Sequence, residues 1–189
     1  MGKILFGVIL GVLLVPVLAL VYFKVGHPPV AVADKPFPME ALITQIPLQA
    51  RINSEMPGNP PVAADEGTLL AGAEVYRDQC AACHGFNGKA SQFGGHMFPG
   101  APPLWEKHPS GNVVGVSDDP PGETYWKVAN GIRLTGMPAF RGTLSETEIW
   151  QVTVLLANAD KPLPPDVLAI VRGELSAPTP QPPSTSPTQ

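Results

Sequence analysis

A continuous apolar run at the N-terminus is the longest feature of the hydropathy pattern. Residues 4–23 are 20 positions without a charged side chain, which is long enough to cross a bilayer as a helix. Cleavable secretory signals have shorter apolar cores, commonly about 7 to 15 residues, although Ala31-Val32-Ala33 resembles a cleavage site. We therefore predict a single-pass transmembrane anchor over residues 1–24, with cleavage of this segment as the alternative.

Beyond residue 65, three segments are predicted to be helical, the first of them from apolar positions near the 3.6-residue period. The first is 68–79, where Thr68 is a candidate cap, and the second is 123–130, which Gly131 would end. The third begins at a capping box of Ser145 and Glu148 and continues to residue 156. Since no part of this region shows a convincing strand pattern, the sequence predicts an all-α fold, with a small helical domain over residues 66–162.

Two proline-rich regions flank the predicted domain. Residues 25–65 contain eight prolines, and this density favours an extended, semi-rigid connector. The alternative is that the apolar residues between 42 and 52 pack on a partner or on the domain. Residues 163–189 are rich in Pro, Ser and Thr, which predicts a disordered tail.

The two cysteines of the chain lie in Cys80-Ala81-Ala82-Cys83-His84. This C-x-x-C-H pattern is the signature of covalent c-type haem attachment. Two thiols at this spacing match the two vinyl groups of haem, and the adjacent His84 is placed to ligate the iron. A zinc site would need further Cys or His residues at close spacing, and a thioredoxin-like redox pair would need a βαβ context. The motif therefore predicts one covalently bound haem c, held by Cys80, Cys83 and His84.

A second axial ligand is expected from the loop Gly136-Met137-Pro138-Ala139-Phe140. The thioether of Met137 is soft and neutral, so it favours ferrous iron and raises the reduction potential. The rivals are His96 and Met97, which follow the haem motif so soon that reaching the opposite haem face would be difficult, and an open sixth site. Trp105 and Trp126 are expected either to pack in the core or to donate an indole N–H to a haem propionate.

The charge balance narrows the class of partners. The formal net charge is −4, and residues 65–161 contain 11 acidic and 7 basic side chains. An acidic domain without a basic face argues against nucleic-acid binding.

Together these segments resemble a class I c-type cytochrome, of the bacterial, monohaem, membrane-anchored kind. The resemblance covers residues from about 67 to 161 and rests on the helix that leads into Cys80, on the Met137 loop and on the final helix. It implies a haem-wrapping helical fold whose first and last helices cross, with Gly72, Tyr76 and Trp150 at the contact.

The resemblance also implies a function, namely one-electron transfer rather than catalysis by the chain itself. The protein would be a carrier, or a subunit of a larger complex, in a bacterial membrane respiratory or dehydrogenase chain with redox proteins as partners. Such haem is attached outside the cytoplasm, so the domain is expected on the periplasmic side of the inner membrane. The alternative is a haem-based sensor or peroxidase-like enzyme, which would need an open sixth site with distal acid–base groups.

Overall fold

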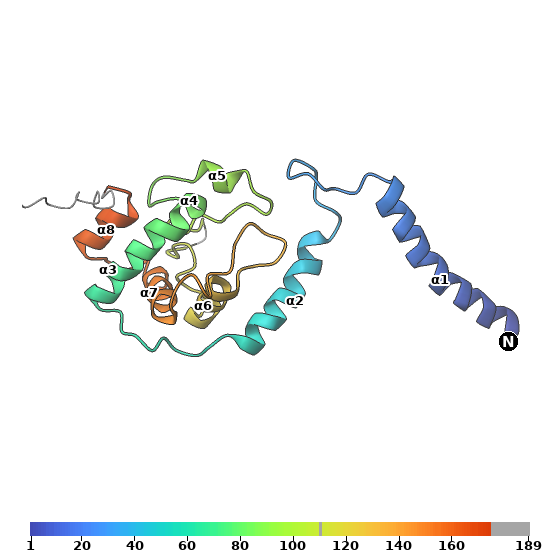
Figure 1. Cartoon of the computed structure of the whole chain (residues 1–189), viewed down its shortest axis with the longest axis horizontal. Helices are drawn as coiled ribbons and strands as arrows, with labels where there is room; N and C mark the ends of the chain where they lie inside the picture. Colours follow the sequence, from blue (N-terminus) through green and yellow to red (C-terminus); the bar gives the residue numbers. More distant parts are fainter. Residues whose placement is uncertain (110, 175–189) are drawn as a thin grey trace, which may run out of the picture. The chain divides into compact units, whose positions relative to one another are not determined.

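The computed structural model describes residues 1–109 and 111–174. In these residues the secondary structure is helical, with isolated β-bridges and no strand, which confirms the predicted all-α class. The helices are α1 (Gly2–Val25), α2 (Glu40–Glu55), α3 (Glu66–Val75), the π-helical turn η1 (Tyr76–Cys80), α4 (Ala81–His84), α5 (Gln92–Gly95), α6 (Pro121–Asn130), α7 (Glu146–Leu156) and α8 (Pro165–Val171) (Figure 1).

The chain divides into two compact units, residues 1–45 and 46–189. The first unit contains α1, a helix that is long and apolar enough to cross a membrane and whose side chains are exposed. The boundary between the units falls inside α2, next to Pro47. The second unit contains the helices predicted for the haem domain.

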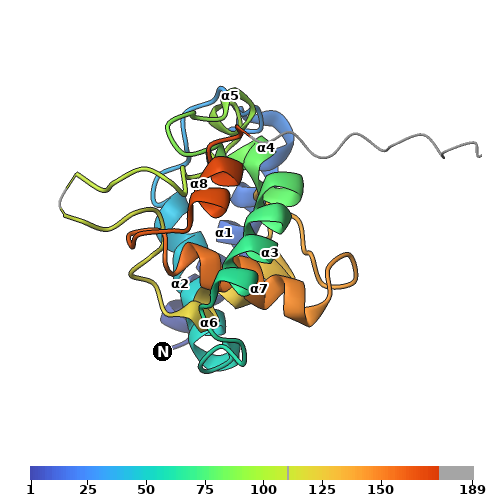
Figure 2. The same cartoon turned by 90° about the vertical axis from the view of Figure 1, so that its left-hand side faces the viewer.

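The core of the second unit is built around the crossing of α3 and α7 (Figure 2). A Cβ atom on Gly72 would lie 2.3 Å from the backbone oxygen of Gln151 on α7, so glycine is what allows the two helices to approach so closely. The other two residues expected at this contact have further partners. Tyr76 donates its hydroxyl to the carbonyl of Gly85 at 2.6 Å, and the ring of Trp150 stacks on Tyr125 of α6.

The ends of the helices follow the local sequence signals, with one correction. Asp65, and not Thr68, caps α3, because its carboxylate accepts a hydrogen bond from the Thr68 N–H at 2.8 Å. Helix α6 ends at Gly131, which has a φ of 66°. The predicted capping box of Ser145 and Glu148 is present at the start of α7.

The region predicted as an extended connector contains helix α2, so the structure corrects the prediction over residues 40–55. The apolar alternative is seen at Ile52, which is completely buried in the second unit. A proline-rich composition lowers the tendency to collapse, but it does not prevent a helix from forming where one apolar face finds a partner.

The disordered tail was predicted to begin too early in the chain. Residues 165–171 form α8, and Val167, Ile170 and Val171 are buried in the core. Pro165 occupies the first turn of this helix, where the missing N–H costs nothing, so the prolines start a new helix as well as ending α7. The remaining part of the predicted tail, residues 175–189, lies outside the described residues.

Candidate haem site

The second unit contains a cavity of about 280 Å³, close to the lower end of the roughly 300–1,000 Å³ typical of cofactor sites. The four side chains predicted to hold a haem, those of Cys80, Cys83, His84 and Met137, all line this cavity. Most of the other lining residues are apolar, and they are Leu48, Met97, Pro99, Ala101, Pro102, Leu104, Val116, Val128, Ile132, Pro138, Phe140 and Leu156. The structure therefore gathers the predicted residues from two distant segments around one apolar space.

The wall that carries the two thiols is a helical turn. The π-helical turn η1 ends at Cys80 and continues directly into α4, which contains Cys83 and His84. Residues three positions apart in a helix lie on the same face, so the two-residue spacer directs both thiols toward the cavity. Both cysteines are partly buried and free.

The two ring nitrogens of His84 have different roles, one as a hydrogen-bond donor and the other as a possible metal ligand. Its Nδ1 lies 2.8 Å from the carbonyl oxygen of Pro102, and because a carbonyl only accepts, Nδ1 carries the proton of the neutral ring. The lone pair of Nε2 is then available to a metal, the usual arrangement for a ligating histidine. Burial lowers the pKa of His84, while the bond to Pro102 acts in the opposite direction. The net shift favours the neutral, ligating form.

The thiol-bearing turn is packed tightly against the short helix α5 that follows it. A Cβ atom on Gly94 would lie 1.9 Å from the backbone oxygen of Cys83, so only glycine fits at this position. Ser91 donates its hydroxyl to the carbonyl of Ala82 at 2.6 Å and accepts the N–H of Gly94. These contacts fix the backbone of the turn.

The environment of Cys80 disfavours both a redox-active pair and a zinc site at these cysteines. Burial raises the pKa of the Cys80 thiol to about 12, whereas redox-active and zinc-binding cysteines act as thiolates and usually have a lowered pKa. Within residues 1–109 and 111–174, no group of three or more Cys, His, Asp or Glu side chains is arranged to hold a metal ion. Two thiols, an imidazole and a thioether around an apolar space fit the donor set of a haem c.

Met137 lies in a loop that is held by short-range hydrogen bonds. The Thr135 hydroxyl donates to the carbonyl of Ile132 at 2.7 Å and accepts the N–H of Met137 at 3.1 Å. The N–H of Ile132 donates to the carbonyl of Met137, and the N–H of Phe140 donates to the carbonyl of Val128 on α6. Met137 therefore lies outside any helix, in a loop held by its own hydrogen bonds and by α6.

The two rival ligands, His96 and Met97, differ in whether they line the cavity. His96 is exposed and does not line the cavity. Met97 does line it, and its methyl carbon would lie 1.6 Å from a Cβ atom on Gly136, so Met97 packs directly against the Met137 loop. Met97 therefore reaches the Met137 loop although it follows the haem motif closely in the sequence, contrary to the expectation from sequence distance.

The two tryptophans have different environments. Trp126 donates its indole N–H to the carboxylate of Glu55 at 3.0 Å, so its acceptor is a protein side chain, which neither of the two alternatives for this residue included. Trp105 is buried with its ring edge-on to Tyr76. In the described part of the chain its indole N–H has no acceptor.

Lys127 and Leu48 are among the cavity-lining residues that were not predicted from the sequence. Lys127 of α6 reaches the cavity and pairs with Glu123 at 2.6 Å and with Asp119 at 3.4 Å. The spacing of Glu123 and Lys127 by four positions was a signal for that pair. Leu48 of α2 also lines the cavity, and no local pattern around it indicates this.

Comparison with known proteins agrees with the site. Residues 67–156 match the family described as "Cytochrome C oxidase, cbb3-type, subunit III". The chain is also 27% identical over 149 residues to a thiosulfate dehydrogenase of Stutzerimonas stutzeri (strain A1501), an alignment that covers 76% of this chain and 45% of that protein. The chain thus spans less than half the length of this relative.

The family match begins just inside α3 and ends with α7. It therefore includes the two helices that cross in the core, the C-x-x-C-H turn and the Met137 loop between them. Because sequence motif, helical fold and family match coincide over the same residues, the chain contains a cytochrome c domain of the class I type over residues 67–156.

Proposed function

We propose that the cavity holds one haem c, joined by thioether bonds to Cys80 and Cys83, with His84 and Met137 as the axial ligands of the iron. A cytochrome c domain implies haem-based electron transfer. One observation carries the assignment of the residues: four side chains of the right chemistry, from segments more than 50 positions apart in the sequence, line a single apolar cavity.

Each protein group has a defined task in this proposal. Bound haem supplies an iron that gains and loses one electron. Pro102 orients the His84 ring through Nδ1, and the Thr135 hydroxyl holds the backbone of Met137. The apolar lining excludes water, and the thioether of Met137 favours the reduced state, so both raise the reduction potential.

The wider setting of the proposal is a bacterial membrane. Helix α1 is long and apolar enough to cross a bilayer, which supports a single-pass anchor in the inner membrane with the haem domain outside the cytoplasm. The protein would then pass electrons between redox proteins of a respiratory or dehydrogenase chain, as a tethered carrier or as a subunit of a larger complex.

The test is the optical spectrum of the purified full-length protein in its oxidised and reduced states. A near-infrared band from methionine to ferric iron is expected in the wild type. Met137→Ala should abolish this band and leave the haem covalently attached. Met97→Ala is the matched control, because Met97 lines the same cavity, and it should retain the band.

The opposite results would each contradict a defined part of the proposal. Loss of the band in Met97→Ala and its retention in Met137→Ala would assign the ligand to Met97. A wild-type protein with a high-spin spectrum that shifts on addition of carbon monoxide would indicate an open sixth site, and with it a gas-binding or peroxidase-like function.

The likeness to a thiosulfate dehydrogenase supports a second candidate, an enzyme or enzyme subunit that takes electrons from thiosulfate. Adding thiosulfate to the oxidised protein separates the two candidates. Reduction of the haem by thiosulfate with the purified chain alone would favour the enzyme, whereas a haem that ascorbate reduces and thiosulfate does not would favour the carrier.

A further inference from the structure

Leu48 is the feature of the haem cavity that the family match does not cover. The match begins at residue 67, yet Leu48 of α2 lines the cavity and is partly buried. Leu42, six positions earlier on the same helix, is 54% exposed. The two leucines therefore have different surroundings, and that of Leu48 needs a physical reason.

Three contacts hold the chain after Leu48 against the rest of the second unit. The side chain of Ile52 is completely buried. The carboxylate of Glu55 accepts the indole N–H of Trp126 on α6 at 3.0 Å. The backbone oxygen of Pro57 lies so close to α6 that a Cβ atom on Gly122 would be 1.9 Å away from it. Residues 55–57 are thus fixed to α6 by a hydrogen bond and a close backbone approach, and Ile52 is buried one turn earlier.

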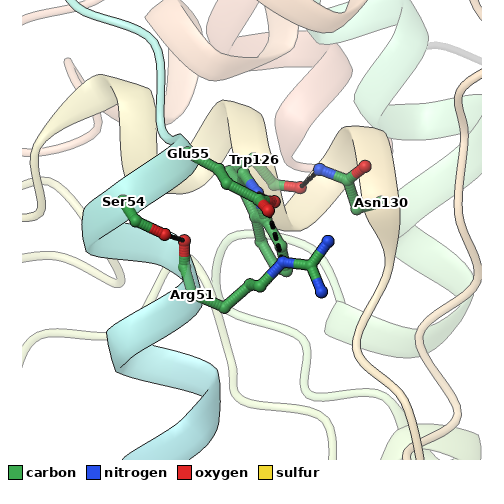
Figure 3. A network of polar contacts seen from close by, with 5 residues as sticks. All are labelled: Arg51, Ser54, Glu55, Trp126 and Asn130. Carbon is green, nitrogen blue, oxygen red and sulfur yellow. Dashed lines mark hydrogen bonds and ion pairs between the residues drawn. The ribbon is translucent and has the colours of Figure 1, made fainter.

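Figure 3 shows the polar part of this attachment. Glu55 lies between Arg51, one turn earlier on α2, and Trp126, and it makes a hydrogen bond with each. The side-chain amide of Asn130 donates to the backbone oxygen of Trp126 at 2.9 Å. The hydrogen bond from Trp126 and, to a smaller extent, that from Arg51 lower the pKa of Glu55. The carboxylate therefore stays an acceptor at neutral pH.

Helix α6 also contributes directly to the cavity. Thr124, Lys127 and Val128 line it, while Gly122 and Trp126 contact residues 55–57. One helix therefore both forms a cavity wall and carries the attachment of α2, and this is how Leu48 is brought to the cavity.

We propose that residues 46–58 form a clasp, held on α6 by Glu55 and Pro57 and in the second unit by the buried Ile52, that seals one side of the haem cavity with Leu48. The inference rests on the proposed function, since it assumes that haem occupies the cavity. The clasp excludes water from the haem and thereby raises its reduction potential, because a drier site disfavours the more highly charged ferric state.

The first test compares two leucine variants of the full-length protein. Leu48→Ser should lower the midpoint potential in a spectroelectrochemical titration, with covalent haem attached at the wild-type level. Leu42→Ser is the matched control, since it makes the same change on the same helix at an exposed position, and its potential should equal that of the wild type.

The second test opens the clasp without touching the cavity. Trp126→Phe keeps an aromatic ring and removes the N–H that Glu55 accepts, so it should lower the potential in the same direction as Leu48→Ser. Trypsin cleaves after Arg51, beside the buried Ile52, and cleavage there requires the clasp to open. We expect this cut to be about fivefold faster in Trp126→Phe, the factor that one hydrogen bond of ordinary net strength contributes to a local opening.

The outcomes distinguish the clasp from the proposed function. A wild-type protein without covalent haem would overturn the proposed function and the clasp's role in the potential with it. A wild-type protein with haem, in which Leu48→Ser and Trp126→Phe both have the wild-type potential, would overturn only the clasp. If Leu48→Ser fails to fold, Trp126→Phe alone decides, by its potential and by its rate of cleavage at Arg51.

Discussion

The two walls of the haem cavity that carry the proposed iron ligands are built in different ways. The thiol-bearing wall is helical: η1 and α4 continue from α3, which crosses α7 in the core. The loop with Met137 has no helix of its own and depends on Gly131, Thr135 and a few backbone bonds to α6. Regular structure fixed by the core is hard to change locally, whereas a loop can alter without unfolding the domain. We therefore expect the first wall to decide whether haem is retained and the second to set its properties.

The largest effect is expected from removing both thiols. Cys80→Ser combined with Cys83→Ser should abolish covalent haem completely, because a serine hydroxyl does not form the thioether bonds. Haem staining after denaturing electrophoresis measures this, with Met137→Ala as the control from the other wall. If the double serine variant were stained for haem, or if Met137→Ala were not, the two walls would not have the separate roles described above.

The next effect concerns Gly131, where the Met137 loop begins. This residue has a φ of 66°, and a Cβ atom on it would lie 2.7 Å from the nitrogen of Ala139 and 2.8 Å from the oxygen of Met137. Gly131→Ala should destabilise the domain by roughly 3 kcal/mol, since left-handed strain and a backbone clash add. It should also weaken the near-infrared methionine band, as measured by absorption alongside urea unfolding.

Gly142 provides the control for this prediction. It also has a positive φ, of 97°, but a Cβ atom there would meet nothing within 4 Å. Gly142→Ala should therefore cost only about 1 kcal/mol, for the backbone strain alone, and leave the band intact. Equal losses in the two variants would show that the close contact at Gly131 is unimportant.

A smaller effect is expected from the helix crossing that supports the thiol-bearing wall. Gly72→Ala places a Cβ atom 2.3 Å from the backbone of α7, and we expect a net loss of about 1–2 kcal/mol, because the gain in helix propensity offsets part of the clash. Gly67→Ala on the same helix meets only the Asp65 side chain at 3.6 Å and should stabilise the protein. Urea unfolding of both variants measures the difference, and a stabilising Gly72→Ala would contradict the close crossing.

The smallest effect concerns the capping box of α7. Ser145→Ala should cost about 1 kcal/mol, the usual value for a lost N-cap.

The hydrogen bonds from the Ser145 side chain and backbone lower the pKa of Glu148. A carboxyl whose pKa is lowered in the folded state stabilises the fold above its unfolded-state pKa, and this contribution is lost as the pH falls through the folded-state pKa. The stability difference between wild type and Glu148→Gln in urea should therefore narrow between pH 7 and pH 3, and a constant difference would count against the capping box as its source.

The features that could be predicted from the sequence are those that depend on neighbours in the chain. The C-x-x-C-H turn, the Ser145–Glu148 capping box and the glycine stop at Gly131 each involve residues within four or five positions of one another. The order of the helices and the all-α class follow from such signals. The apolar period also indicated α3 and α7, although the exact cap of α3 was missed.

The features that could not be predicted depend on contacts between distant residues. Glu55 and Trp126, which hold the clasp, are 71 positions apart, and nothing near either residue indicates the other. Met97 was placed too far from the Met137 loop because sequence distance was used as a measure of spatial distance. The burial of α8 was likewise hidden by proline content, which describes the chain locally and does not report its tertiary partners, whereas that of Ile52 was expected only as the alternative to an extended connector.

Helix α8 has a consequence for the order of events during synthesis. The N–H of Asn87, three residues after the haem motif, donates to the carbonyl of Val171 at 2.8 Å, so this bond waits until almost all of the described chain has been made. Contacts that close such long loops form late, because closing the loop lowers the entropy of the chain before the new contact stabilises the fold. We therefore expect both thiols to remain open to alkylation in a chain ending at residue 164, and to become protected only when α8 is present. The C-terminal helix, which also contacts η1, would then complete the packing around the thiol-bearing turn only at the end of synthesis.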